Sequence, residues 1–272
     1  MNNKMINLII FGDTFGIPML INCVKECNVS CNISAIVAAS IRPHQHEELG
    51  KIANYLSIPL IIQPKRDDKS YPFFVRSISK MKPDFIIVNS YSMKLHPEVL
   101  AIPKIASINV HGGLLPEYRG ANPIQWAIIN AETETGVTIH YMTEEIDAGD
   151  IISQKRVPIF FEDTWLDVRN RLYVATEEIL REELPKIFEG KNSRVAQDES
   201  KSRYWKRRKP EDGLIDWYRP ALYIYNLIRA LVKPLPGAFY FDKNGQKITI
   251  DYFVPYEEVR KLQKRIIGYV IE

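Results

Sequence analysis

The stretch MINLIIFG, residues 5–12, decides the fold of this 272-residue chain. Its side chains are apolar almost without interruption, which is typical of a strand that is buried on both faces of a parallel sheet. Apolar residues at helical spacing follow over 17–27, and a second apolar run, ISAIVAA, occupies 33–39. A strand, a helix and a second strand in this order predict a βαβ unit.

The alternation of strands and helices continues along the first half of the chain. Three more strands are predicted, at 59–63, 84–90 and 106–111. Two more helices are predicted, at 46–56 and 72–81, each ahead of one of these strands. This order predicts an α/β fold, a Rossmann-like, mostly parallel sheet with helices on both faces, because right-handed crossovers place the helices there.

The pattern past residue 111 is less regular. A helix is predicted at 122–131, and period-two alternation predicts strands at 135–143 and 150–159. A longer helix is expected from Thr164, because Thr164 and Asp167 form a capping-box pattern. Pro185 should kink or end this helix, since proline interrupts a helix interior.

A change of composition marks the last third of the chain. Residues 189–213, EGKNSRVAQDESKSRYWKRRKPEDG, are polar and irregular. Beyond them the sequence predicts one helix over about 220–232 and short β-like runs around KITIDYF and IIGYVIE. We therefore expect a catalytic domain over 1–190, a linker over 191–213 and a small helix-and-β subdomain over 214–272.

The composition is that of an ordinary globular protein, with 46% hydrophobic and 25% charged residues. No apolar run is long enough to predict a membrane helix, and the first residues lack the cleavage site of a secretory signal. A cytoplasmic protein is therefore expected. The net charge of +3 is too small to indicate nucleic-acid binding by itself.

The cysteines and histidines of the first fifty residues do not predict a metal site. Cys23, Cys27 and Cys31 fit neither a disulfide framework nor a complete tetrahedral site. Small buried hydrophobes are the favoured interpretation, over a metal or redox role. His44 and His46 form an isolated pair without further ligands.

Chemistry is expected at the carboxyl ends of the strands, where sites form in open parallel sheets. NVHGGLLPEYRG, residues 109–120, ends such a strand, and Asn109 and His111 face the same side of it. An amide can donate hydrogen bonds to an oxyanion, and an imidazole can move protons near neutral pH. By themselves these two residues fit structural roles equally well.

Asp147 favours the catalytic interpretation. It lies in EEIDAGD, a glycine-containing loop between two predicted strands, from which a carboxylate can orient an imidazole and favour its charged form. No activated serine or cysteine accompanies the three residues, so direct transfer between two bound substrates is favoured over a covalent enzyme intermediate. His140 lies inside a predicted strand and is expected to be structural.

The segment INVHGGLLPEYRGANPIQWAIINAETETGVTIHYMTEEIDAGDII resembles the core of the folate-dependent formyltransferases, including the methionyl-tRNA formyltransferases. The resemblance covers residues 5 to about 160. The matching motifs, in order, are Asn109, His111, LLP at 114–116, RG at 119–120, TGVT at 135–138 and D-x-G at 147–149.

The resemblance implies both a reaction and a donor. An amine of the acceptor attacks the formyl carbon of N10-formyltetrahydrofolate, and no metal takes part. Asn109 and His111 stabilise the tetrahedral oxyanion, His111 also handles the amine proton, and Asp147 orients and charges His111. The folate-binding residues are expected in two loops, and they are Tyr91, Ser92, Met93, Ile146 and Asp147.

Membership of this family leaves the acceptor open among methionyl-tRNA, glycinamide ribonucleotide, water and a nucleotide-linked amino sugar. The tRNA enzymes are usually longer and carry a basic insertion after the second strand, whereas AASIRPHQHEELGKIA has two cations there, Arg42 and Lys51. The ribonucleotide enzymes usually stop near 200 residues and have Pro-Ser after the catalytic histidine. The hydrolases usually carry an additional N-terminal domain.

The C-terminal sequence favours the amino sugar. RRKPEDGLIDWYRPALYIYNLIRALVKPLPGAF resembles the matching region of the enzymes that formylate UDP-4-amino-arabinose and dTDP-linked amino sugars. A dTDP-, UDP- or GDP-linked 3- or 4-amino deoxysugar is therefore the expected acceptor, for a surface polysaccharide such as lipopolysaccharide O-antigen. Substrate-binding residues are predicted on both sides of residue 200, and they are Lys94, Tyr118, Arg119, Arg207, Arg208, Trp217 and Tyr223.

The stretch KSRYWKRRK, residues 201–209, contains six cations and two aromatic residues. It can bind a pyrophosphate through arginine forks, form a solvated linker, or contact nucleic acid by stacking and charge. The first interpretation is favoured, so neither a nucleic-acid nor a membrane partner is expected. The resemblance also implies a homodimer through the C-terminal part. A methionyl-tRNA enzyme with a reduced C-terminal domain and a non-catalytic binding module are the alternatives.

Overall fold

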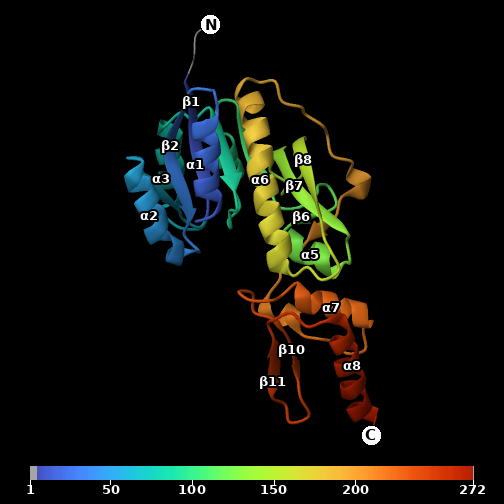
Figure 1. Ribbon diagram of the computed structural model, residues 1–272. Helices are drawn as coiled ribbons and strands as arrows, with labels where there is room; N and C mark the ends of the chain where they lie inside the picture. The colour runs from blue at the N-terminus through green and yellow to red at the C-terminus, as the bar shows by residue number, and fades with distance from the viewer. Residues whose placement is uncertain (1–4, 272) are drawn as a thin grey trace. The chain divides into compact units, whose positions relative to one another are not determined.

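The computed structural model describes residues 5–271, with side chains described for 5–268. Its main element is a seven-stranded sheet in the order β3-β2-β1-β4-β5-β7-β8 (Figure 1). The strands are β1 (Ile6–Gly12), β2 (Cys31–Ala39), β3 (Leu60–Gln63), β4 (Phe85–Asn89), β5 (Ala106–His111), β7 (Glu134–Tyr141) and β8 (Ile151–Pro158). The predicted Rossmann-like, mostly parallel sheet is confirmed.

Helices connect these strands and also follow them. They are α1 (Gly16–Glu26), α2 (His46–Tyr55), α3 (Tyr71–Lys80), α4 (Pro97–Leu100), α5 (Pro123–Ile129), α6 (Trp165–Phe188), α7 (Ala221–Arg229) and α8 (Tyr256–Ile271). Two pairs of short strands complete the fold. They are β6 (Arg119–Gly120) with β9 (Tyr204–Trp205), and β10 (Ala238–Phe241) with β11 (Lys247–Ile250).

Strand direction changes between β5 and β7, near the functional end of the sheet. β3, β2, β1, β4 and β5 are parallel, and β7 is antiparallel to β5. The chain builds β2 and β3 on one side of β1 and then returns to β4 on the other. The strand order therefore reverses between β1 and β4, where open α/β sheets form a crevice at their carboxyl ends.

The core of the sheet follows the alternation of its side chains. Ile9 and Phe11 of β1 belong to one apolar cluster with Phe74 and Ile78 of α3. Leu8 and Ile10, the alternate residues of β1, are fully buried and point to the opposite face, on which Figure 1 shows α1. The near-continuous apolar character of β1 is thus explained by burial on both faces.

The residue contacts divide the chain into two compact units. The first consists of Met1–His111, Val137–Lys155 and Thr176–Glu199, and the second of Gly112–Gly136, Arg156–Ala175 and Ser200–Glu272. Both units draw on segments from distant parts of the sequence. The sequence-based boundaries at 190 and 213 remain a prediction.

Two expectations about helices were wrong. Of the two outcomes expected at Pro185, a kink or an end, the end is wrong: α6 continues to Phe188, because Leu184, Ile187 and Phe188 are buried on either side of the proline. The run IIGYVIE is not β-like, since its residues 266–271 belong to α8, while Glu272 lies outside the described residues. The strong helix formers of 257–265 carry the helix into these β-branched positions.

The segment 189–213 contains more structure than its composition indicates. It includes β9 and two short 3₁₀ helices, Glu199–Lys201 and Pro210–Gly213. Val195 forms an antiparallel bridge with Ile151 at the start of β8. Backbone pairing therefore fixes parts of a segment whose side chains are mostly polar.

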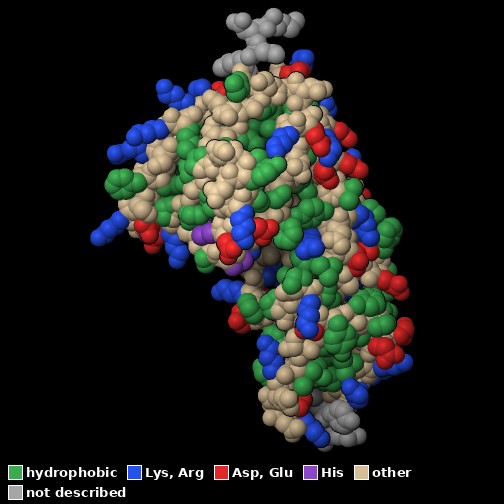
Figure 2. All heavy atoms as spheres, turned by 60° about the vertical axis from the view of Figure 1, so that its left-hand side comes forward, with side chains coloured by type: hydrophobic (Ala, Val, Ile, Leu, Met, Phe, Trp, Pro, Cys, Tyr) green, Lys and Arg blue, Asp and Glu red, His purple; other side chains and the backbone are tan. Residues whose placement is uncertain are grey.

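Within residues 5–271, no helix combines the length and the apolar character that crossing a bilayer needs. On the face that Figure 2 shows, lysine and arginine side chains alternate with acidic ones.

Candidate active site

Two neighbouring strands of opposite direction bring the first polar side chains together. β5 ends at His111 and pairs with β7 so that Asn109 lies opposite His140, and His111 opposite Thr138. Residues two apart on a strand share a face, and so do directly opposed residues of an antiparallel pair. Asn109, His111 and His140 therefore project from one face of the sheet at the end of β5.

Asp147 joins this group from the loop between β7 and β8. Its Oδ2 lies 3.6 Å from His111 Nδ1, and its Oδ1 lies 3.4 Å from Asn109 Nδ2. The side chains of His111 and Asp147 are 7% and 10% exposed, so water screens their interaction only weakly. The structure thus brings together an amide, an imidazole and a carboxylate, the three residues for which sequence analysis predicts catalytic roles.

His140 belongs to the same cluster, which sequence analysis missed. Its Nδ1 lies 2.8 Å from the carbonyl oxygen of Tyr141, and this contact assigns the proton to Nδ1. Nε2 is then an acceptor, to which Asn109 Nδ2 donates at 3.1 Å. The pairing of β7 with β5 is the missing information, because it places His140 opposite Asn109.

The loop after β4 carries most of the predicted folate-binding residues. The Tyr91 ring packs edge-on against Phe11, with centroids 5.4 Å apart, and its hydroxyl donates to Gln63 Oε1 at 2.9 Å. Gln63 Nε2 donates in turn to the Lys94 carbonyl at 3.1 Å. Burial raises the pKa of Tyr91, so this hydroxyl stays a donor. The buried Gln63 therefore holds both ends of the loop.

The other predicted folate-binding residues occupy positions of different exposure. Ser92 and Met93 are half-buried, and the Met93 sulfur lies 3.7 Å from Ser40 Oγ. Ile146, next to Asp147, is 42% exposed. The Lys94 side chain is exposed. All of these residues belong to the first unit, as Asn109, His111 and Asp147 do.

Tyr118 and Arg119 belong to the second unit and are built into it tightly. The Tyr118 hydroxyl donates to Glu132 Oε1 at 2.6 Å, and the ring stacks on Trp205 with centroids 5.6 Å apart. Burial raises the pKa of Tyr118. Arg119 is buried at the start of β6, whose next residue, Gly120, faces β9. Both predicted substrate residues are therefore held by their surroundings.

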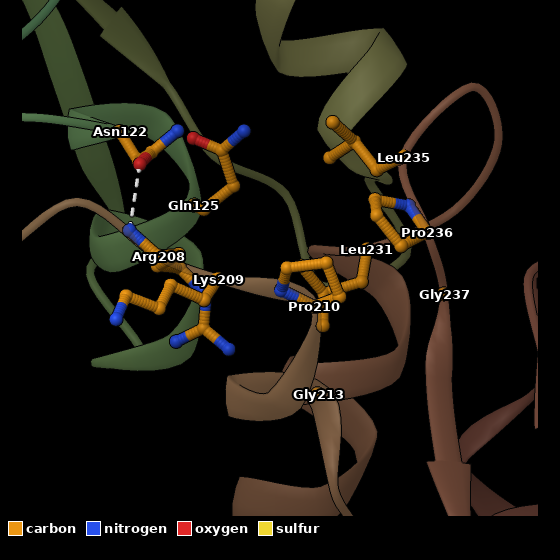
Figure 3. Close-up of a pocket in the computed structure, with 10 residues that line it drawn as sticks. All are labelled: Asn122, Gln125, Arg208, Lys209, Pro210, Gly213, Leu231, Leu235, Pro236 and Gly237. Atoms are coloured by element: carbon orange, nitrogen blue, oxygen red, sulfur yellow. Dashed lines mark hydrogen bonds between the residues drawn. The ribbon is translucent and has the colours of Figure 1, made fainter.

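Arg208 lies on the other side of this aromatic group. Its guanidinium lies 4.8 Å from the centre of the Trp126 ring, and its Nη2 donates to the Asp212 carbonyl at 2.5 Å. Its backbone N–H donates to Asn122 Oδ1 at 3.0 Å, as the dashed line in Figure 3 shows. Burial lowers the pKa of Arg208, and its Nε is a buried donor without a hydrogen-bond partner.

A small pocket adjoins Arg208 within the second unit (Figure 3). Its volume is about 100 Å³. Pockets that enclose a whole small molecule usually measure about 300–1,000 Å³, so this one can take only part of a ligand. It is lined by Asn122, Gln125, Arg208, Lys209, Pro210, Gly213, Leu231, Leu235, Pro236 and Gly237.

The remaining predicted substrate residues differ in their availability. Arg207 is exposed beside Arg208. Trp217 is 8% exposed and packs edge-on against Tyr240, so its burial fits a core role better than the predicted stacking on a nucleotide base. Tyr223 is half-buried, with the Arg219 guanidinium 4.4 Å from its ring centre. Of the two aromatic candidates, Tyr223 is the more accessible.

The cysteines take no part in these groups. All three are free thiols, and Cys23 is buried. Burial raises the pKa of Cys23 to about 11 and that of Cys31 to about 12, so the thiols stay protonated. Among the described residues, no group of three His, Cys, Asp or Glu side chains could hold a metal ion.

The sequence was compared with models of known protein families. The formyl transferase model matches residues 4–184, and the model of the formyl transferase C-terminal domain matches residues 207–272. The chain belongs to the formyl transferase family. The cluster of Asn109, His111 and Asp147 lies within the first match, and Arg208, Trp217 and Tyr223 lie within the second.

Solved structures share the fold of this formyltransferase. A sugar N-formyltransferase from a Shewanella species is 23% identical, with a TM-score of 0.75, and the match covers 92% of this chain and 98% of that one. A 4-N formyltransferase from Francisella tularensis is 20% identical, with a TM-score of 0.72 and the same two coverages. An N-formyltransferase from Helicobacter canadensis, solved with folinic acid and dTDP-3-aminofucose, is 19% identical, with a TM-score of 0.65 and coverages of 84% and 81%.

Proposed function

We propose that this formyltransferase moves the formyl group of N10-formyltetrahydrofolate to the amine of a nucleotide-linked 3- or 4-amino deoxysugar. The observation that carries the proposal is the cluster of Asn109, His111 and Asp147 at the end of β5 in a member of the formyl transferase family. The product would serve a surface polysaccharide, and the expected setting is a cytoplasmic homodimer.

The geometry of the cluster gives each residue a task in this transfer. His111 presents Nδ1 to Asp147, so its Nε2 is the nitrogen that takes the proton from the attacking amine and returns it to the leaving nitrogen. Asp147 stabilises the charged imidazolium that forms meanwhile. Their separation of 3.6 Å is long, and catalytic contacts of this kind commonly tighten when substrates bind.

Asn109 stabilises the oxyanion that develops on the formyl oxygen. Its amide nitrogen carries two protons, of which one goes to His140 Nε2. The other faces Asp147 Oδ1 at 3.4 Å, a long contact that a developing oxyanion can replace. A donor held in place before the reaction lowers the barrier more than one that must first reorient.

The donor and the acceptor have separate support. The loops at 91–94 and 143–147 belong to the same unit as the cluster, and the exposed Ile146 offers an apolar contact for a flat pteridine ring. For the acceptor, the Arg208 pocket can take one phosphate-sized part of a nucleotide diphosphate, with Arg208 and Lys209 as the cations of its lining. The structural similarity to an enzyme solved with folinic acid and dTDP-3-aminofucose agrees with both assignments.

One assay tests the proposal. The protein is incubated with N10-formyltetrahydrofolate and a panel of dTDP-, UDP- and GDP-linked 3- and 4-amino sugars, and tetrahydrofolate release and product mass are followed. We expect one nucleotide sugar to gain a formyl group. Formylation of methionyl-tRNA with no sugar turnover would contradict the proposal, and so would tetrahydrofolate release that needs no acceptor.

A further inference from the structure

The loop that carries Asp147 is held in a conformation that it would not keep by itself. Asp147 has a φ of +55°, a left-handed conformation that costs roughly 1 kcal/mol for a residue with a Cβ atom. Gly149 packs so closely that a Cβ there would lie 1.9 Å from the Tyr141 carbonyl oxygen. Strained positions of this kind persist only where the surrounding structure determines them.

Gln197 makes two contacts with this loop from a segment some fifty residues away. Its Nε2 donates to the carbonyl oxygens of Asp147 and Gly149, both at 2.7 Å. The two protons of one amide group thus hold the backbone on either side of Ala148. The first of these bonds goes to the residue whose carboxylate faces His111.

The rest of this segment fixes the loop at its C-terminal end. Arg194 Nε donates to Asp150 Oδ2 at 2.6 Å, and its guanidinium lies 4.6 Å from the centre of the Tyr141 ring. Val195 exchanges both backbone hydrogen bonds with Ile151, at 2.8 and 2.9 Å. Residues 192–197 therefore run alongside the loop and anchor it at several points, and we call them the strap.

We propose that Gln197 is a positioning residue for catalysis, which holds the Asp147 backbone so that its carboxylate faces His111. The inference rests on the proposed function of Asp147. These two hydrogen bonds go to backbone carbonyl oxygens and not to the His111 ring or the Asp147 carboxylate, so Gln197 acts through the loop. The strap consequently supports catalysis by positioning Asp147, although its composition is that of a linker.

Two substitutions separate hydrogen bonding from packing at this position. Gln197→Met keeps the length of the side chain and removes both donors. Gln197→Glu keeps the shape but presents acceptor oxygens to two carbonyl oxygens, which repel it. If Gln197 acts by donating hydrogen bonds, activity falls from the wild type to Gln197→Met and further to Gln197→Glu. If it acts by packing, Gln197→Glu keeps more activity than Gln197→Met.

The chain offers a matched control in the second unit. Gln263 Nε2 also donates to two loop carbonyls, those of Trp217 at 2.6 Å and Arg219 at 2.8 Å. Gln263→Met therefore removes the same pair of bonds from a loop without Asp147. We expect both methionine variants to lower the denaturation midpoint by similar amounts, because each loses two hydrogen bonds.

The test is steady-state kinetics with the formyl donor and the amino sugar that the wild type uses, together with hydrogen–deuterium exchange of residues 142–151. For Gln197→Met we expect kcat to fall about 10- to 100-fold, little change in either KM, and faster exchange in this segment. Gln263→Met should keep the wild-type kcat. Unchanged kcat in Gln197→Met, or an equal loss in Gln263→Met, would overturn the inference. An inactive wild type would instead refute the proposed function. Faster exchange of residues 142–151 in Gln197→Met would even then show that Gln197 holds the loop.

Discussion

Asn109 has an amide nitrogen with two protons and two neighbouring acceptors, one on His140 and one on Asp147. This arrangement fixes which atom of the amide, the nitrogen or the oxygen, faces the substrate. A side-chain amide by itself rotates between two orientations that differ only in the exchange of nitrogen and oxygen. The acceptor at His140 Nε2 selects the orientation with the nitrogen in the cluster, so His140 does more than fill the core.

Asp147→Asn should lower kcat about 10²- to 10⁴-fold, since the imidazolium that forms at His111 loses its carboxylate. The affinity for the nucleotide sugar should stay within a few-fold of the wild-type value, because the predicted acceptor residues are elsewhere. Kinetics and calorimetric titration with the sugar check both parts. A kcat close to that of the wild type would refute the role of Asp147.

His140→Leu should lower kcat about tenfold, because Asn109 loses the acceptor that orients its amide. His140→Gln can still present an oxygen to Asn109 and should lose less activity. Kinetics of the two variants are compared at equal folded fraction, measured by circular dichroism. A Gln variant as impaired as the Leu variant would mean that the acceptor is not what matters.

At the scale of elements, the apolar runs at 5–12, 33–39 and 84–90 predicted their strands closely, because burial on both faces leaves an unmistakable pattern. The direction of β7 could not be predicted, since alternation of side chains is the same in parallel and antiparallel strands. For that reason Asn109, His111 and Asp147 could be predicted and His140 could not.

Glycines show the same limit on prediction from sequence. Gly120 has a φ of +97°, and a Cβ there would lie 2.3 Å from the Trp205 carbonyl oxygen, whereas a Cβ at Gly112 would meet no atom within 4 Å. The two residues are alike in the sequence NVHGGLLPEYRG. Only the pairing of β6 with β9, which joins distant segments, makes one of them indispensable to the fold.

Gly120→Ala should therefore destabilise the protein by about 1–3 kcal/mol, because the left-handed backbone is strained and β6 is forced away from β9. Gly112→Ala is the control and should change the free energy of unfolding by less than about 0.5 kcal/mol. Urea denaturation of the three proteins makes the comparison. Equal effects of the two substitutions would contradict the close approach at β6.

The start of α6 should make stability depend on pH through Asp163. Burial alone would raise the pKa of this carboxyl, which is 8% exposed, but the Arg171 guanidinium and the Phe160 N–H hold the pKa below the usual 3.8. A lowered pKa in the folded state means that the carboxylate stabilises the fold above about pH 4. This contribution is lost as pH falls through the folded-state pKa.

Asp163→Asn should accordingly cost about 1–3 kcal/mol of unfolding free energy between pH 5 and pH 7. The difference from the wild type should shrink as pH falls below about 4, because the unfolded-state carboxyl then takes up a proton more readily than the folded-state one. Urea denaturation at a series of pH values measures this difference. A cost that does not change down to pH 3 would show that the charge of Asp163 does not matter.

At the scale of the whole molecule, the two units hold different groups of residues. The acid–base cluster and the strap belong to the first, and the Arg208 pocket belongs to the second. Substitutions in the acid–base cluster and the strap should therefore change mainly kcat, and those around Arg208 mainly the KM of the acceptor.

Arg208→Lys tests this division. An ammonium group lacks the planar fork that binds phosphate in two places and stacks on an aromatic ring. We expect the KM of the nucleotide sugar to rise about tenfold, with the KM of the formyl donor and kcat within about threefold of the wild type. A selective rise in the donor KM would assign Arg208 to the other substrate.

The antiparallel return of β7 also bears on how this enzyme acquires its activity as it folds. The contact between Asn109 and His140 spans 31 residues, and that between Gln197 and Asp147 spans 50. Contacts of long sequence separation form late, because closing their loops costs entropy before any contact repays it. During refolding, a chain whose helices have already formed can therefore be inactive, and catalytic turnover becomes a reporter of the long-range tertiary contacts.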